Sequence, residues 1–233
     1  LMAIDISRPF EKSVFKVNLK NRKITRLIRG KKRIRDWVTD RQGNVRIGSA
    51  LNYETGHRQI FLRDKDDNYE ELYAYNVSED KPIYVSGFAA DPNILYIQKY
   101  LNDHLALYKL DLTTREETLV LADDEYDVDG SLIYSPVTND AIGVKGPRGS
   151  HYWDDRYAPL RKGLEKLFKD SYFSFKAFSR NEDVYLLYTQ SDTQPGRYYI
   201  GNQKEVTINF LFDQYPDVDT AALSEHELIT FTA

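Results

Sequence analysis

Short apolar runs, separated by turn-forming residues, make up most of the chain. Tyr, Val, Ile and Phe cluster in these runs, and Asp, Asn, Gly and Pro divide them. Runs rich in β-branched and aromatic residues that are bounded in this way predict β-strands. We expect strands at 13–19, 45–52, 58–62, 71–76, 83–88, 94–101, 105–112, 132–135, 141–145, 173–178, 184–190, 197–201 and 205–212.

Several of these runs alternate with a period of two. In Leu105–Leu112 the even positions are all apolar or aromatic, whereas the odd positions include Lys109 and Asp111. Successive side chains of a strand point to opposite faces of a sheet. The pattern therefore predicts a strand with one packed face and one mixed face.

A weak internal repeat accompanies the strands. A turn rich in Asp and Asn precedes a short apolar strand four times, at Asp40, Asp91, Asn139 and Glu182, with spacings of 51, 48 and 43 residues. Each interval holds about four strand-sized runs, and four strands is the number in one blade of a β-propeller. We therefore predict an all-β fold, a partial β-propeller of about five four-stranded blades. A β-sandwich, which lacks such a long period, remains the alternative.

Two segments break the strand pattern and predict one or two short inserted helices. Residues 158–170 have Pro159 in the first turn and place Leu160, Leu164, Leu167 and Phe168 on one face, as in an amphipathic helix. Residues 216–223 predict a short helical turn with acidic residues near its start.

Both ends of the chain have the composition of strands, at 1–6 and 228–232. We expect residues 1–233 to form a single, truncated propeller domain and 214–233 to be a linker that leads out of it. Because an open ring exposes strand edges, we expect the chain to self-associate or to close into a small ring.

Composition narrows the function classes. The absence of Cys excludes disulfides, thiolate catalysis and Cys-ligated zinc. No run is long and apolar enough to span a membrane as a helix, and no segment resembles a signal peptide. The net charge of −4 gives no general attraction to nucleic acid. The cellular compartment stays open.

The usual catalytic and metal-binding motifs are not matched. No Gly-x-Ser-x-Gly elbow occurs, and Ser150 and His151 are adjacent, so in an extended chain they point in opposite directions. The acidic segment Glu125–Gly130 imitates a calcium loop, but Pro136 stands where a bidentate Glu is needed. We predict no catalytic residue, no metal site and no cofactor in this chain.

One segment is strongly basic. Lys12–Arg35 contains eleven Lys or Arg and no Asp or Glu, a pattern that can indicate nucleic-acid binding. Apolar residues alternate with these charges, which favours a hairpin with a solvated outer face. We expect no nucleic-acid partner.

The segment Ser191–Ile200 is the best candidate for a binding loop. Pro195 and Gly196 predict a tight turn, and Arg197, Tyr198 and Tyr199 open the next strand. Arg197, Asp192 and Tyr198 are therefore candidate substrate-binding residues. In the alternative, which we favour for Arg197, this residue pairs with Asp192 and stabilises the hairpin.

Several segments together resemble one family. Val14–Lys20 followed by Asp36–Gly48, then Ser191–Tyr199, and finally 215–233 resemble the propeller, and its bridge to the catalytic domain, of bacterial prolyl oligopeptidase family serine peptidases. The similar members are the acylaminoacyl-peptidase-like and dipeptidyl-aminopeptidase-like ones. The departure at Gly201–Lys204, where the family tends to have an Asp-containing turn, affects only local turn geometry.

The resemblance implies a propeller above a C-terminal α/β-hydrolase domain with a Ser, Asp and His triad, none of which maps onto this chain. The implied reaction is peptide hydrolysis through an acyl-enzyme. The propeller would gate the active site and help to bind short peptides, so its implied partners are the hydrolase domain and short peptides, with no nucleic acid and no membrane.

Two other function classes stay open at this point. One is a free-standing propeller that acts as a scaffold for protein partners. The other is a propeller glycosidase, which needs carboxylates that converge on a central channel. Acidic residues recur near strand ends, but turn formation explains them equally well.

Overall fold

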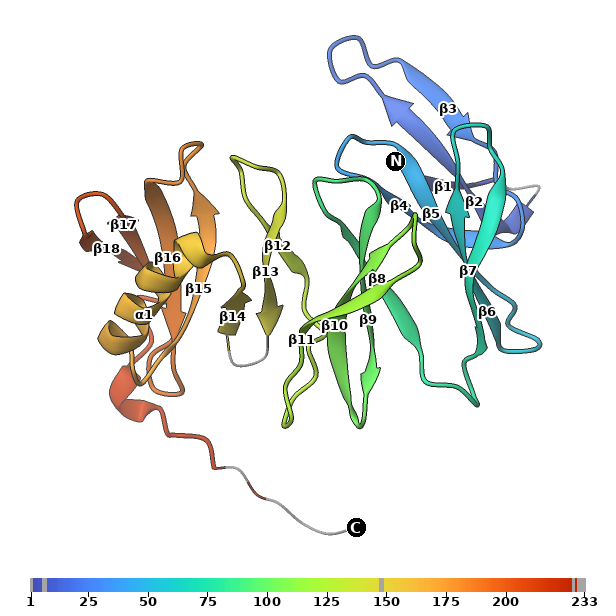
Figure 1. Cartoon of the computed structure of the whole chain (residues 1–233). Helices are drawn as coiled ribbons and strands as arrows, with labels where there is room; N and C mark the ends of the chain where they lie inside the picture. Colours follow the sequence, from blue (N-terminus) through green and yellow to red (C-terminus); the bar gives the residue numbers. More distant parts are fainter. Residues whose placement is uncertain (1, 6–7, 147–148, 228, 230–233) are drawn as a thin grey trace. The chain divides into compact units, whose positions relative to one another are not determined.

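The computed structural model describes residues 2–5, 8–146, 149–227 and 229, and these residues form five antiparallel β-sheets (Figure 1). Contacts divide the chain into two compact units, 1–125 and 126–233. One sheet of the first unit contains β1 (Met2–Asp5), β2 (Arg8–Val17) and β3 (Ile24–Ile28). The next contains β4 (Ile34–Thr39), β5 (Val45–Leu51), β6 (His57–Arg63) and β7 (Tyr69–Asn76). Another contains β8 (Ile83–Phe88), β9 (Ile94–Leu101), β10 (His104–Asp111) and β11 (Glu117–Leu121).

The second unit contains the other two sheets and the described helical segments. Its strands are β12 (Leu132–Tyr134), β13 (Ala141–Gly146) and β14 (Gly149–Tyr152), then β15 (Tyr172–Phe178), β16 (Val184–Gln190), β17 (Arg197–Asn202) and β18 (Thr207–Asp213). Its helical segments are η1 (Asp155–Tyr157), α1 (Ala158–Leu167) and η2 (Thr220–Ala222).

Every sheet is a meander in which each strand pairs with the next one along the chain. This is the connectivity of a propeller blade, and it confirms the predicted all-β class. Three sheets have the expected four strands, whereas β1–β3 and β12–β14 have only three among the described residues. The predicted terminal strand at 1–6 is present as β1, while the one at 228–232 falls, except for Ile229, outside the described residues.

Adjacent sheets of the first unit share their cores. One cluster joins Ile47 and Ile60 of the β4–β7 sheet to Leu95, Ile97 and Leu110 of the β8–β11 sheet. The two middle strands of the β8–β11 sheet, β9 and β10, are buried for most of their length.

This packing corrects the expectation for 105–112. Leu105 and Leu107, at odd positions, are as buried as the even-numbered Ala106 and Leu110. Side-chain burial alternates only in the second half of β10, where Lys109 and Asp111 are half-buried.

The second unit has its own aromatic-rich core. Leu164 of α1 packs with Phe175, Tyr185 and Leu187 on one face of the β15–β18 sheet. The helix begins at the predicted residue and ends three residues earlier than predicted, and Leu167 is 57% exposed, so it does not belong to the packed face. The second predicted helix, at 216–223, is only the short turn η2.

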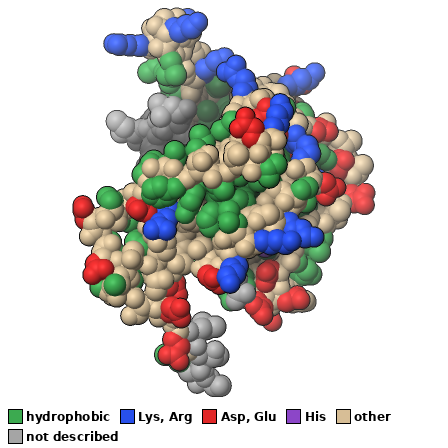
Figure 2. Space-filling model, turned by 90° about the vertical axis from the view of Figure 1, so that its left-hand side faces the viewer, with side chains coloured by type: hydrophobic (Ala, Val, Ile, Leu, Met, Phe, Trp, Pro, Cys, Tyr) green, Lys and Arg blue, Asp and Glu red, His purple; other side chains and the backbone are tan. Residues whose placement is uncertain are grey.

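The other face of the β15–β18 sheet is apolar and only partly covered. Leu186 pairs with Ile200, and Tyr198 lies between Tyr188 and Phe212 across the strands. Phe212 is 53% exposed. Figure 2, which views the molecule from the side on which β18 lies in Figure 1, shows hydrophobic side chains gathered on this surface.

The repeated turns occupy the same position in four sheets, between the first and the second strand. In the turn after β4, Asp40 Oδ1 accepts hydrogen bonds from the backbone N–H groups of Gln42 (3.0 Å) and Asn44 (2.8 Å). Asn44 Nδ2 donates to Asp40 Oδ2. Gly43 takes the left-handed conformation (φ 87°) that closes the loop. The acidic residue thus replaces backbone partners that the turn cannot supply.

The same Asp-x-x-x-Asn turn recurs between β6 and β7. Asp64 accepts hydrogen bonds from the backbone N–H groups of Asp66 and Asn68 and from Asn68 Nδ2. These bonds, the Asn68 side chain foremost, lower the pKa of Asp64. Unlike Asp40, Asp64 is exposed.

The repeated turns also connect neighbouring sheets. In the first unit Gln42 Nε2 donates to the carbonyl of Ala90 at 2.8 Å, in the next repeated turn. In the second unit the Ser135 hydroxyl donates to the carboxylate of Glu182, again from one repeated turn to the next. Both links join segments 47 or 48 residues apart in sequence.

We expect Asp40→Ala to lower the free energy of unfolding by about 1–3 kcal/mol, because it removes a buried carboxylate that accepts partly buried backbone N–H groups. Asp64→Ala is the matched control, since it removes the same three bonds where water can replace them. Urea unfolding of both variants measures the difference. If both variants lose the same free energy of unfolding, the burial of Asp40, which is 4% exposed, does not contribute to stability.

A second pair of variants tests the core of the last sheet. A Cβ on Gly201 would lie 2.0 Å from Tyr185 Cζ, whereas a Cβ on Gly163 of α1 would meet nothing within 4 Å. We expect Gly201→Ala to destabilise by about 1–3 kcal/mol through overpacking, and Gly163→Ala to stabilise by about 0.5–1 kcal/mol through helix propensity. Thermal melting with opposite signs for the two variants is the expected result; a tolerated alanine at 201 would contradict the tight Tyr185 contact.

Candidate functional site

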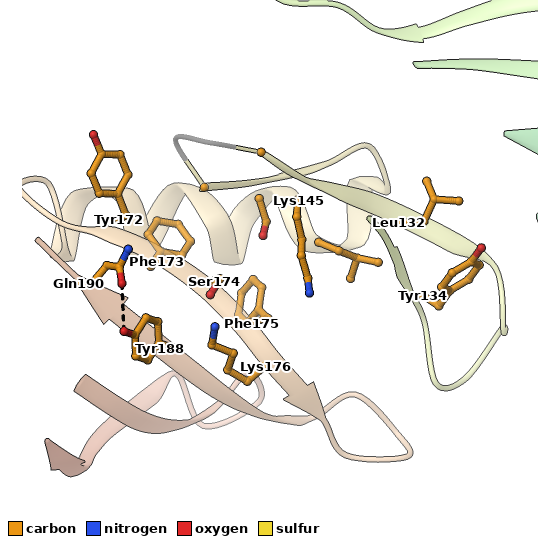
Figure 3. Close-up of a pocket in the computed structure, with 14 residues that line it drawn as sticks. Leu132, Tyr134, Lys145, Tyr172, Phe173, Ser174, Phe175, Lys176, Tyr188 and Gln190 are labelled. Atoms are coloured by element: carbon orange, nitrogen blue, oxygen red, sulfur yellow. Dashed lines mark hydrogen bonds between the residues drawn. The ribbon is translucent and has the colours of Figure 1, made fainter. Parts of the chain in front are cut away.

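A pocket of about 480 Å³ lies in the second unit, between the β12–β14 sheet and the inner strand β15 (Figure 3). Its volume is in the range of small-ligand sites. The lining residues are Leu132, Ile133, Tyr134, Lys145, Gly146, Gly149, Ser150, Tyr172, Phe173, Ser174, Phe175, Lys176, Tyr188 and Gln190. It therefore combines aromatic walls with two cationic side chains.

A β-bulge positions the first of these cations. In the pairing of β15 with β16, Phe175 is opposite Leu187 and Ala177 is opposite Leu186, so Lys176 has no partner across the strands. A bulge redirects the side chain of the extra residue and bends the strand. Figure 3 shows the Lys176 side chain beside β15, with its ammonium next to Tyr188.

The second cation, Lys145, comes from β13 of the neighbouring sheet. Its backbone N–H donates to the Ser131 carbonyl, and a Cβ on Gly130 would lie 1.8 Å from the Lys145 carbonyl oxygen. The segment before β12 can approach β13 this closely only because residue 130 is glycine. Gly130 thus fixes the backbone from which Lys145 enters the pocket.

The pocket has a positive balance of charge. None of its lining residues is Asp or Glu, and neither lysine forms an ion pair with a described residue. Burial, and then the nearby charge of Lys145, lowers the pKa of Lys176. Two ammonium groups that line one pocket without an acidic residue favour an anionic ligand between them.

Tyr188 orients Lys176 and connects the pocket to the rest of the sheet. The Lys176 ammonium lies 4.3 Å from the centre of the Tyr188 ring, a cation–π contact. Tyr188 Oη hydrogen bonds with Gln190 Oε1 at 3.0 Å. On its other side the Tyr188 ring packs against Tyr198, with 5.1 Å between ring centres.

None of the three residues predicted from sequence, Arg197, Asp192 and Tyr198, lines this pocket. Tyr198 touches it only through Tyr188. Arg197 Nε donates to Asp213 Oδ1 at 2.7 Å, and this carboxylate raises the pKa of Arg197. The expected pairing of Arg197 with Asp192 is therefore wrong, because Arg197 lies directly across the strands from Asp213.

Asp192 has a different partner in the C-terminal segment. The His226 backbone N–H donates to Asp192 Oδ2 at 2.9 Å, and His226 Nδ1 lies 2.8 Å from Asp192 Oδ1. The backbone bond, followed by the imidazole, lowers the pKa of Asp192. Asp192 thus attaches residue 226 to the β16–β17 turn. Whether Arg197, Asp192 or Tyr198 touches a substrate stays a prediction.

The lysines of the pocket were missed in the sequence. The alternation of Phe173 and Phe175 with Ser174 and Lys176 places Lys176 away from the core face, and this signal was available. What the sequence does not contain is the adjacency of Lys145, which depends on how one sheet packs on the next.

The basic segment forms the predicted hairpin of β2 and β3. Its cations are dispersed among acids and aromatic rings: Lys12 pairs with Asp36, Lys31 pairs with Asp67, and Lys32 lies over the Phe61 ring. Of its apolar residues, Ile24 and Leu27 are exposed, while Val14 and Ile28 are buried.

Other kinds of site are not found in the part of the chain that the structure describes. No group of three or more His, Asp or Glu side chains there could hold a metal ion. No helix there is long and apolar enough to cross a membrane.

Comparison with known proteins identifies the fold but no family. No protein-family model and no curated protein matches the sequence. A puromycin hydrolase mutant complexed with PGG is similar in structure, with a TM-score of 0.52 and 12% sequence identity, over 90% of this chain and 33% of that one. TolB from Acinetobacter baumannii matches with a TM-score of 0.49 and 14% identity, over 91% of this chain and 52% of that one.

The fold is that of a β-propeller. The chain spans about half of the TolB structure and a third of the hydrolase structure. A structure described as one of two prolyl endopeptidases also matches, with a TM-score of 0.41 and 10% identity, over 90% of this chain and 32% of that one. At these identities the β-propeller fold is what the comparison establishes.

We expect the Arg197–Asp213 pair to have a minor structural role. The two side chains are 40% and 31% exposed, and exposed ion pairs contribute about 0.2–1 kcal/mol. A double-mutant cycle of Arg197→Ala and Asp213→Ala, measured by urea unfolding, should give a coupling energy in that range. The Arg197→Ala, Asp192→Ala cycle is the control and should give none. Coupling of Arg197 to Asp192 instead would contradict the structure.

Proposed function

We propose that this chain is the non-catalytic propeller domain of a prolyl oligopeptidase family serine peptidase, and that it gates and helps to bind short peptide substrates. The observation that carries the proposal is the pocket of the second unit. It is about 480 Å³ in volume and is walled by aromatic residues, which suits a short peptide and excludes a folded protein.

The segments that resemble the family support the proposal in a limited way. Asp36–Gly48 spans β4, the Asp40 turn and the start of β5, and Ser191–Tyr199 spans the turn between β16 and β17. Both segments therefore build blades. They favour a propeller of this kind, whereas the peptide-binding role depends on the pocket.

In this proposal, catalysis belongs to a hydrolase domain that these residues do not contain. The Ser150 side chain lines the pocket, but its neighbour His151 lies next to it on β14 and so points to the opposite face of the sheet. A serine nucleophile needs a base within hydrogen-bond reach. The chain's own contribution would be to select and hold the substrate.

We expect the 233-residue chain to hydrolyse neither chromogenic peptides nor esters, and not to react with a fluorophosphonate probe. The product of the whole gene should do both, at a serine in a Gly-x-Ser-x-Gly segment beyond residue 233. Labelling followed by peptide mapping measures this. Turnover by the 233-residue chain that disappears when one of its own residues is replaced would contradict the proposal. A stop codon directly after residue 233 would contradict it too, and would favour a free-standing scaffold.

A further inference from the structure

The pocket between β12–β14 and β15 has a chemical character more specific than peptide binding. It holds two lysines from different sheets, and the residues around them include no carboxylate among those that line it. Each ammonium disfavours the charge of the other, and an anion bound between them would stabilise both charges. The pocket therefore favours an anionic ligand.

We propose that Lys145 and Lys176 bind the C-terminal carboxylate of a short peptide, with an aromatic or apolar residue of that peptide against Tyr172. This inference rests on the proposed function for the identity of the ligand as a peptide. It goes further in assigning the recognised group and the two residues that recognise it.

The first argument is geometric. Lys176 is the unpaired residue of the β-bulge, and the Tyr188 ring lies beneath its ammonium at 4.3 Å. The ring restricts the side chain without neutralising it, so all the hydrogen-bond donors of the ammonium remain for a ligand. Charge-assisted hydrogen bonds from such a group to a carboxylate are about twice as strong as neutral ones.

The second argument concerns the residues beside the two lysines. Gly146, Gly149 and Ser150 line the pocket next to Lys145, and glycine allows a ligand to approach the backbone closely. Tyr172 and Tyr188 add aromatic side chains from β15 and β16. The pocket thus offers cationic, polar and aromatic contacts to one small ligand.

The size of the pocket favours the terminal carboxylate of a short peptide over an acidic side chain of a larger partner. A volume of about 480 Å³ accommodates a few residues at most. In a chain so short, the terminal carboxylate is present whatever the sequence. Recognition of that group would give a binding domain that tolerates varied side chains and selects for length.

A matched pair of ligands tests the proposal. We expect N-acetyl-Phe-Gly to bind the 233-residue chain in calorimetric titration, and N-acetyl-Phe-Gly amide, which differs only in its missing charge, to bind about tenfold more weakly. Lys176→Met and Lys145→Met should each weaken binding of the acid by about tenfold and leave binding of the amide unchanged. Lys176→Arg should retain the preference for the acid. Lys162→Met, on the exposed side of α1, is the control for a general change in charge.

Equal binding of acid and amide would overturn this inference and leave the proposed peptide-binding role intact. Loss of acid binding in Lys162→Met as well as in Lys176→Met would overturn it too, since the effect would then be one of net charge. Binding of neither peptide to the folded chain, with folding checked by circular dichroism, would overturn the inference and remove the support of the proposed function as well.

Discussion

Burial of apolar sheet faces against one another is the interaction on which the rest of the structure depends. In the first unit Ile60 of one sheet and Ile97 of the next belong to a single cluster, so neither sheet could bury its face alone. The middle strands β9 and β10 are buried over most of their length, and most of their buried residues are apolar. The hydrogen-bonded meander sets the order of the strands, and the packing of faces sets their stability.

This constraint decides where polar chemistry can occur. The buried stretches of the middle strands leave no room for unpaired polar groups, and the outer strand β18 is largely exposed. What remains are the turns, the strand ends and the bulges. The buried Asp40 and Glu182 lie in such turns and are used up by internal hydrogen bonds. The pocket lysines lie on β13 and β15. In contrast to the two acids, they form no ion pair with a described residue.

The sequence predicted what local interactions determine. The turns at Asp40, Asn139 and Glu182 could be found because an acidic, amide or hydroxyl side chain near a left-handed residue closes a turn within a few residues. Among the described residues the sheets at β1–β3 and β12–β14 have three strands each, because the average spacing of the repeat says nothing about individual sheets. The partner of Arg197 was misassigned for a related reason: Asp192 is nearer in sequence, but the antiparallel register brings Asp213 opposite.

The pocket could not have been predicted from the sequence, because its parts become neighbours only through packing between sheets. Lys145 and Lys176 are 31 residues apart, and each by itself resembles an ordinary exposed lysine at a strand end. Two local irregularities bring them together: the bulge at Lys176 and the close approach of Gly130 to the Lys145 backbone. A regular β15 would place residue 176 opposite its neighbour on β16, and a Cβ at residue 130 would displace β13. Departures from ideal sheet geometry thus bring two exposed lysines together in one cationic site.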